Sequence, residues 1–300
     1  MNDRLNLRVA LAALAVGLLA GVIGARAAET DSAATPLAAA RKLFEAGRYP
    51  EARAALTKVT TAEPQNAEAF LYLGWTTLRL NAPDESAKFL ETATTLDGTR
   101  SLYFHVLGDA YGEILQRASL FAKPGWARKC LAAYDRAIAL DPDDVDAREA
   151  RMSYYRHAPA IAGGGMDKAR AEAAEIRKRD AVRGAQAFVD LCVAEKKYAD
   201  AFAVVDELIA QNPGSKPAQY QLGRLAAITG KQLDRGAAAL QEYLQHTPTG
   251  RDPALCAAHW CLGMIAAKKG DKDAARREYE TALQLNPDFP VVRDALKQLR

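Results

Sequence analysis

The apolar positions of this chain recur in a fixed order, which is clearest in the segment HWCLGMIAAKKGDKDAARREYETALQLNP, residues 259–287. A first predicted helix carries a Leu-Gly pair and an alanine one turn later, and the polar stretch KKGDKD makes a turn. A second predicted helix carries small and aromatic residues one turn apart and is closed by a proline. These positions are Leu262, Gly263, Ala266, Ala275, Tyr279, Ala282 and Pro287. The pattern predicts a helix-turn-helix unit.

The same order recurs upstream, so that the chain contains about seven such units. The glycine lets the first helix of a unit approach the second closely, and the fifth unit departs from this pattern because Val189 fills its glycine position. The upstream positions are Ala40, Leu43, Ala52, Leu56 and Pro64; Phe70, Leu73, Gly74, Ala87 and Leu90; Phe104, Leu107, Gly108, Tyr111, Cys130, Tyr134, Ala137 and Pro142; Met152, Tyr155, Ala169, Ala173 and Ile176; Phe188, Cys192, Ala201, Val205, Leu208 and Pro213; and Leu222, Gly223, Ala226, Leu240, Tyr243 and Pro248.

This order of leucine-glycine, alanine, aromatic, alanine and proline resembles the tetratricopeptide repeat (TPR). The resemblance covers nearly all of the chain after its N-terminal segment. It implies an all-α fold, a right-handed TPR superhelix (an α-solenoid) of about seven helix-turn-helix units over residues 36–287. The amphipathic segment 288–300 is then expected to be a C-terminal cap helix, because the open end of a repeat array needs a polar outer face.

Composition agrees with this picture and narrows the function classes. Hydrophobic residues make up 49% of the 300 residues and charged residues 26%, which is typical of a globular chain. Alanine and leucine dominate and β-branched residues are sparse, which favours helices. The formal net charge of +3 is too small to indicate a nucleic-acid binder.

Residues 1–27 have the three-part layout of a secretory signal peptide. Arg4 and Arg8 precede a 17-residue apolar run, and the sequence Ala25-Arg26-Ala27 at its end is a cleavage pattern. We therefore expect cleavage after Ala27, a short flexible N-terminus over residues 28–35 and a periplasmic location. The alternative is an uncleaved segment that anchors the chain, and we expect membrane association only in that case.

Two units are longer than the others, with insertions near residues 114–127 and 158–166. The first contains Phe121 and Trp126, and these aromatic residues either form an exposed contact surface or fold back onto the second insertion. The two insertions, with the text AYGE and GGGMDKA, also resemble a group of exported bacterial TPR proteins, a resemblance that implies an architecture and no activity. Insertions of this kind fall on one face of a repeat array, often a binding face.

The second insertion contains three consecutive glycines, Gly163, Gly164 and Gly165. A glycine-rich loop that leads into a helix can cradle a phosphate. Here no strand precedes the glycines and no G-K-[ST] motif follows them, so the better interpretation is a lengthened turn between the two helices of the fourth unit. We treat Phe121, Trp126 and the three glycines as a candidate loop surface.

No arrangement of residues indicates catalysis or metal binding. His105, His157, His246 and His259 form no H-E-x-x-H motif, and the cysteines Cys130, Cys192, Cys256 and Cys261 have no zinc-type spacing. In an exported protein these cysteines could pair, but we expect small buried apolar residues. We therefore predict a protein that is not an enzyme and needs no cofactor or metal.

The inner face of such an array is lined by the first helix of each unit. The residues on that face, between the buried Leu-Gly positions, are Leu71, Trp75, His105, Asp109, Glu149, Arg156, Gln186, Asp190, Tyr220, Arg224, Trp260 and Met264. Aromatic and arginine side chains contribute strongly at interfaces, so these residues are candidates for binding a protein or peptide. The alternative for Trp75, Tyr220 and Trp260 is packing between units.

Three functions follow from these observations. The first is a non-catalytic, exported scaffold that binds a protein or peptide of unknown identity in the concave groove, with no nucleic acid involved. The second is a small-ligand-binding accessory protein of a periplasmic solute uptake system, which some repeat proteins with a similar glycine insertion resemble. The third is an enzyme or nucleotide binder that uses the glycine loop, and the missing phosphate motif argues against it.

Overall fold

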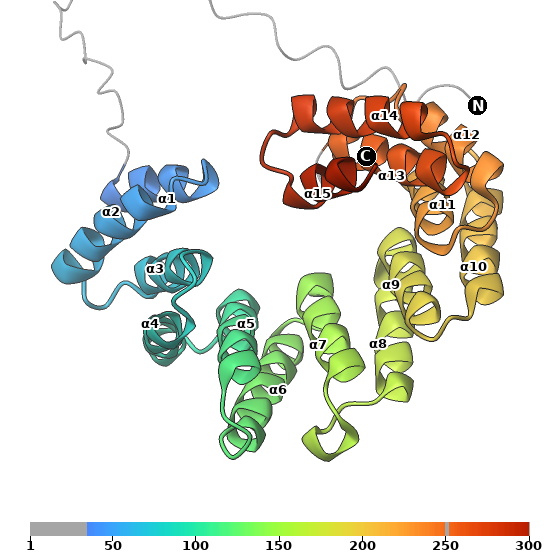
Figure 1. The fold of residues 1–300 in the computed structure, drawn as a ribbon. Coiled ribbons are helices and arrows are strands. Elements are labelled where there is room, and N and C mark those ends of the chain that lie inside the picture. The colour runs from blue at the N-terminus through green and yellow to red at the C-terminus, as the bar shows by residue number, and fades with distance from the viewer. Residues whose placement is uncertain (1–34, 250–251, 300) are drawn as a thin grey trace, which may run out of the picture.

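The computed structural model describes residues 35–249 and 252–299, and in these ranges the chain is all-helical (Figure 1). The predicted signal segment 1–27, and all of the predicted flexible segment except residue 35, lie outside the described residues. The first helices of seven successive pairs are α1 (Pro36–Glu45), α3 (Ala67–Arg79), α5 (Ser101–Arg117), α7 (Val145–His157), α9 (Ala181–Ala194), α11 (Lys216–Thr229) and α13 (Leu255–Lys268). Their partners are α2 (Tyr49–Ala62), α4 (Pro83–Leu96), α6 (Lys123–Leu140), α8 (Met166–Arg179), α10 (Tyr198–Gln211), α12 (Leu233–Tyr243) and α14 (Lys272–Leu285).

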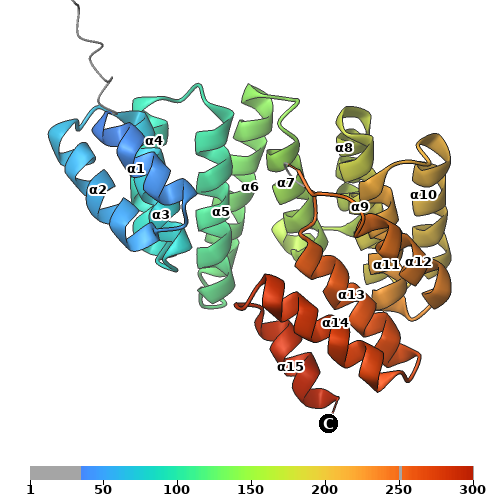
Figure 2. The same cartoon turned by 90° about the horizontal axis from the view of Figure 1, so that it is seen from above.

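The pairs follow one another along a C-shaped arc (Figure 1). The first helices α1, α3 and α9 lie toward the inner side of the arc, and their partners α2, α4 and α10 lie outside them. The last helix, α15 (Pro290–Gln298), packs against α14 at the end of the array, as the view from above shows (Figure 2). The predicted all-α superhelix of seven units with a cap helix is confirmed. Within the described residues no helix is long and apolar enough to cross a bilayer.

The Leu-Gly positions bring the two helices of a unit into direct contact. A Cβ atom added at Gly223 would lie 2.1 Å from Cγ of Leu240, and one added at Gly263 would lie 2.4 Å from the ring of Tyr279. A Cβ at Gly108 would likewise meet the ring of Tyr134 at 2.5 Å. No side chain fits at such distances, so glycine is required for close helix packing, as predicted.

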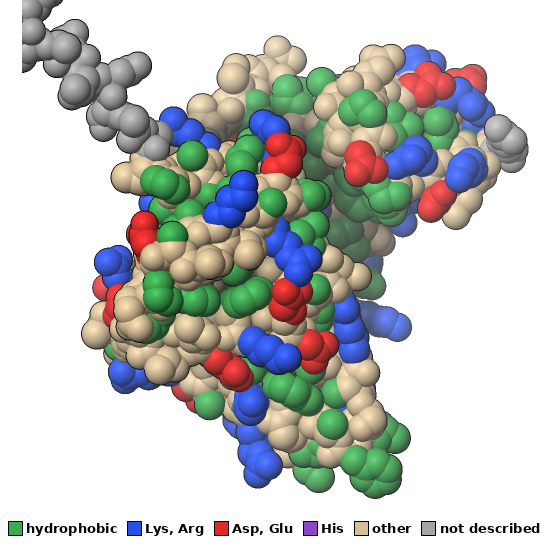
Figure 3. Space-filling model, turned by 90° about the vertical axis from the view of Figure 1, so that its left-hand side faces the viewer, with side chains coloured by type: hydrophobic (Ala, Val, Ile, Leu, Met, Phe, Trp, Pro, Cys, Tyr) green, Lys and Arg blue, Asp and Glu red, His purple; other side chains and the backbone are tan. Residues whose placement is uncertain are grey.

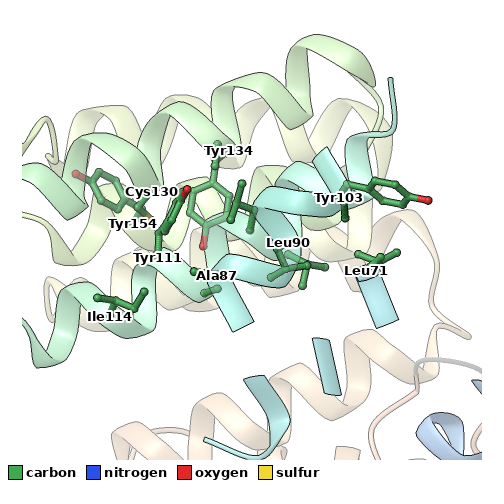
Figure 4. Packing of buried hydrophobic residues seen from close by; sticks show 14 of the residues in the cluster. Leu71, Ala87, Leu90, Tyr103, Tyr111, Ile114, Cys130, Tyr134 and Tyr154 are labelled. Carbon is green, nitrogen blue, oxygen red and sulfur yellow. The ribbon is translucent and has the colours of Figure 1, made fainter. Parts of the chain in front are cut away.

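The core lies between neighbouring helices in several clusters, and the largest extends from α3 to α7. Figure 4 shows Tyr111, Tyr134 and Tyr154 in this layer among leucine and alanine side chains. The Tyr134 hydroxyl donates a hydrogen bond to Asp109 (2.9 Å), and the Tyr111 hydroxyl donates one to Glu91 (2.7 Å). Each phenol thus buries its ring and keeps a polar partner for its hydroxyl.

A buried ion-pair network joins α7 to α8 in the fourth unit. The carboxylate of Glu172 accepts hydrogen bonds from Arg148 (2.7 Å) and from Arg151 (2.5 Å). The side chains of Glu172, Arg148 and Arg151 are only 5%, 8% and 17% exposed. Arg148 also donates from Nε to the carbonyl of Pro142 (2.8 Å), so the network ties the entrance of α7 to the middle of α8. The repeat pattern gave no indication of it.

Candidate functional site

Two of the predicted groove residues lie in the core. Leu71 is 1% exposed and belongs to the cluster between α3 and α7, while Tyr220 is 7% exposed and packs against the ring of Tyr243 at 5.3 Å. Burial raises the pKa of Tyr220, in agreement with this environment. The prediction that Leu71 lines an open groove is wrong, and Tyr220 packs against α12 and α13, which is the alternative that the sequence left open for it.

The two predicted groove tryptophans also contribute to packing. Trp75 is partly buried and lies 5.1 Å from the ring of Phe44 in the first unit. Trp260 is partly buried against Phe289 at the start of the cap helix (5.5 Å), and Met264 lies in the same cluster. These side chains therefore hold neighbouring elements together, which is the alternative that the sequence left open for Trp75 and Trp260.

Several charged groove candidates are paired across neighbouring first helices. Glu149 on α7 accepts a hydrogen bond from Arg183 on α9 (2.8 Å), and Asp190 on α9 accepts one from Arg224 on α11 (2.9 Å). Because each partner comes from the next unit, these pairs fix the spacing of successive first helices. Gln186 is partly buried on α9 beside them.

Arg156, the remaining candidate on α7, is partly buried near the end of that helix. Its Nε atom is buried and has no hydrogen-bond partner among the described residues.

The predicted residues His105 and Asp109 are on α5, and Asp109 lines a pocket of about 450 Å³ between α3 and α5. We call it the Asp109 pocket. Its lining residues are Leu78, Arg79, Asn81, Pro83, Asp109, Gly112, Glu113, Gln116, Arg117 and Tyr134. Most of these residues were not predicted from the sequence, although Arg79 and Glu113 stand one helical turn beyond the predicted Trp75 and Asp109.

The electrostatics of the Asp109 pocket are set by opposite charges at close range. Burial raises the pKa of Asp109, while the charge of His105 and the hydrogen bond from Tyr134 partly oppose that rise. His105 Nε2 lies 3.6 Å from Asp109, and Arg117 lies 3.6 Å from Glu113. Arg79 and Gln116, in contrast, form no ion pair or side-chain hydrogen bond within the described chain. Their hydrogen-bonding groups are therefore available to a ligand.

The glycine loop is a closed turn. The N–H groups of Gly163, Gly164 and Gly165 donate to the carbonyls of Ala160 (2.9 Å), Pro159 (3.2 Å) and Tyr155 (2.8 Å), and a 3-10 turn, η1 (Ala160–Ala162), precedes them. Gly163 has φ +83° and a Cβ at Gly164 would lie 1.9 Å from the Ala158 carbonyl oxygen. The loop therefore needs glycine for its shape and has none of these three amides left for a phosphate.

The first insertion is largely helical. It lengthens α5 to 17 and α6 to 18 residues and leaves a turn at 118–122. Trp126 lies in α6, partly buried against Tyr111 at 5.7 Å, whereas Phe121 in the turn is 98% exposed. Of the two candidate aromatic residues, only Phe121 is therefore exposed to solvent.

Within the described residues no group of His, Cys, Asp and Glu side chains could hold a metal ion. All four cysteines are free, with Cys130 and Cys261 at 1% and 2% exposure and Cys192 and Cys256 partly buried. Burial raises the pKa of the Cys130 thiol to about 12 and that of Cys261 to about 11.

These thiol environments predict the order of alkylation. At pH 8 the native protein should react with iodoacetamide at Cys256 and Cys192 first, since raised pKa values and burial leave almost no accessible thiolate at Cys130 and Cys261. We expect the two buried thiols to react at least about tenfold more slowly, and all four to react alike in denaturant. Peptide mass spectrometry over time measures this. Equal native rates would contradict the burial described above.

Comparisons with known proteins agree with the repeat architecture. Residues 37–100 and 256–289 match family models described as tetratricopeptide repeat. No curated protein matches the chain significantly. A TPR protein of Parabacteroides merdae is similar in structure, with a TM-score of 0.61, 16% identity, and coverage of 88% of this chain and 97% of the other. A thermophilic TPR protein of Thermus thermophilus has a TM-score of 0.48 and 20% identity, covering 70% of this chain and 97% of its own.

The fold is thus that of a tetratricopeptide repeat solenoid, and two segments of the chain match tetratricopeptide repeat models. This repeat typically builds non-catalytic scaffolds that bind protein or peptide partners, and neither matched model describes an enzyme family.

Proposed function

We propose that this protein is an exported, non-catalytic scaffold that binds a peptide segment of a partner protein in the Asp109 pocket. The observation that carries the proposal is a pocket between two first helices whose Arg79 and Gln116 side chains form no ion pair or hydrogen bond within the described residues, although the charge of Arg79 acts on Asp109. Peptide carbonyl and carboxylate groups are suitable acceptors for a guanidinium and an amide.

The surroundings of the pocket support a peptide as the ligand. Its lining contains both donors and acceptors, with the arginines Arg79 and Arg117 and the carboxylates Asp109 and Glu113. A peptide backbone offers both kinds of group at regular spacing, whereas a simple anion or cation would meet the wrong charge on half of the lining. Leu78 and Pro83 add apolar surface for a side chain.

Export rests on the N-terminal sequence. Arg4 and Arg8, the apolar run and the Ala25-Arg26-Ala27 pattern support secretion and cleavage after Ala27. The mass of the protein isolated from a native envelope fraction tests this: a chain that begins at Ala28 is expected, and a chain that retains residues 1–27 would contradict cleavage.

The peptide site is tested by removing the two unpaired side chains. The double variant Arg79→Ala/Gln116→Ala should lose partners that the wild-type protein captures by crosslinking in the envelope fraction. Two hydrogen bonds, one of them charge-assisted, correspond to a loss of about 2–4 kcal/mol, or roughly thirtyfold to a thousandfold in affinity. Titration calorimetry with the captured partner measures the change.

Arg276→Ala is the matched control, since Arg276 on α14 is exposed and forms no ion pair in the described chain. It should leave capture unchanged. Full capture by the double variant would refute the assignment of the pocket. A saturable rise in melting temperature with a small organic acid, without any captured protein, would favour the small-ligand alternative.

A further inference from the structure

Three large apolar side chains at one edge of the array lie almost wholly outside the protein. Leu120 and Phe121 in the turn between α5 and α6 are 82% and 98% exposed, and Ile161 in η1 is 96% exposed. The next most exposed large apolar side chain in the described chain, Leu285, is only 52% exposed. We call Leu120, Phe121 and Ile161 the apolar tip. Side chains of this kind at full exposure lose the free energy that burial would provide, which indicates a contact outside the chain.

The two turns that carry the apolar tip lie at the same edge of the array. Helix α6 contacts η1, and Ala158 and Ala162 pack in the same cluster as Trp126 and Leu131. Both turns lie at the lower edge of the arc in Figure 1, where α5 meets α6 and where α7 meets η1. Figure 3 shows hydrophobic side chains gathered at the lower end of the molecule with lysine and arginine side chains near them.

The base of the tip is tied to neighbouring helices by packing and hydrogen bonds. The ring of Trp126 packs on Tyr111 at 5.7 Å, and Lys168 donates to the carbonyl of Gly163 at 2.8 Å. The Tyr154 hydroxyl donates to the carbonyl of Ala162 at 2.5 Å, which holds η1 against α7. These contacts hold the start of α6 against α5 and η1 against α7, beneath the exposed side chains.

The charge around the tip is mainly basic, although Glu113 and Asp167 directly border the two segments that carry it. Residues 114–131 and 155–166 contain the basic residues Arg117, Lys123, Arg128, Lys129 and Arg156 and no aspartate or glutamate. In the whole chain, by comparison, 40 basic residues are nearly balanced by 37 acidic ones. Lys123 and Arg128 form no ion pair within the described residues, so their charges are available to an anionic surface.

We propose that the apolar tip and its basic surroundings dock on the surface of a bilayer that contains anionic lipids. A protein partner would need a cavity for each projecting side chain, whereas the interfacial region of a bilayer accepts separate Leu, Phe and Ile side chains wherever they enter. Anionic headgroups attract Lys123 and Arg128 at the same depth. Docking at this edge involves none of the residues that line the Asp109 pocket except Arg117, and it is independent of the proposed peptide binding.

The first test is sedimentation of the full chain with vesicles of phosphatidylcholine containing about one third phosphatidylglycerol. The variant Leu120→Ser/Phe121→Ser/Ile161→Ser should bind at least about tenfold more weakly than wild type, because three apolar side chains no longer enter the interface. Lys123→Glu/Arg128→Glu should weaken binding to these vesicles and not to pure phosphatidylcholine. Leu285→Ser/Val291→Ser, at the other end of the array, is the matched control and should bind like wild type.

The second test reports on the tip alone, since residues 1–27 are themselves apolar and common to all variants. In the variant Phe121→Trp, the fluorescence of the new tryptophan should shift to shorter wavelength on anionic vesicles and be quenched by brominated lipid. In the control Leu285→Trp, the new tryptophan should show neither the shift nor the quenching. Unquenched Phe121→Trp fluorescence, or equal sedimentation of the triple-serine variant, would overturn the proposal. A change from dimer to monomer in that variant, without a change in vesicle binding, would overturn it in favour of self-association. Circular dichroism checks that the variants are folded.

Discussion

Glu172→Gln should destabilise the protein by about 3–5 kcal/mol in its free energy of unfolding. Glu172 is the carboxylate shared by Arg148 and Arg151, and it is only 5% exposed. Glutamine keeps the shape of the side chain but removes its charge, which leaves the guanidinium of Arg148, at 8% exposure, buried without a counter-charge. Urea denaturation followed by the helix signal in circular dichroism measures the change.

Glu175→Gln provides the control on the same helix. Glu175 is 37% exposed, and hydrogen bonds from Lys178 and Arg179 lower its pKa to about 2. Water surrounds this pair, so its loss should leave the free energy of unfolding nearly unchanged. If Glu172→Gln were as mild as Glu175→Gln, the ion-pair network could not be a main support of the fourth unit.

The repeat units were predictable because their determinants are local. In the seventh unit, Gly263 and Tyr279 meet across one turn, which the sequence order alone implies. The sequence did not predict in the same way which face of a first helix stays exposed to solvent. Leu71 and Tyr220 occupy the predicted face, but the packing of the next unit decides whether that face is covered, and this depends on the superhelix as a whole.

Other features depended on pairs of distant or compensating residues. Arg148 and Glu172 are separated by the glycine insertion, so no periodic pattern connects them.

In the fifth unit Val189 stands in place of the glycine, and it is nevertheless buried, at 1% exposure, in one core cluster with Val205. In the sixth unit the residue that faces the glycine is Leu240. Val205 is shorter than Leu240, so it leaves room for the larger side chain of Val189. The sequence did not predict that α6 begins at Lys123, because Pro124 follows it. A proline is nevertheless readily accommodated in the first turn of a helix.

Gly223→Ala is expected to cost about 1–3 kcal/mol of stability, the range of an overpacked core. The added methyl group would lie 2.1 Å from Cγ of Leu240, so α11 and α12 would have to separate or Leu240 would have to leave its rotamer. Both helices also contact α13, and the strain should therefore reach the seventh unit. Thermal unfolding followed by circular dichroism measures the loss.

Gly125→Ala is the matched control, because a methyl group at Gly125 meets nothing within 4 Å and the residue has no positive φ. It should be neutral or stabilise the protein by about 0.5 kcal/mol through the smaller entropy of the unfolded chain. A double-mutant cycle then assigns the cause: in the Leu240→Ala background, Gly223→Ala should cost much less than in wild type, since the clashing atoms are gone. Equal costs in both backgrounds would mean that the glycine acts through backbone freedom and not through the close approach of the two helices.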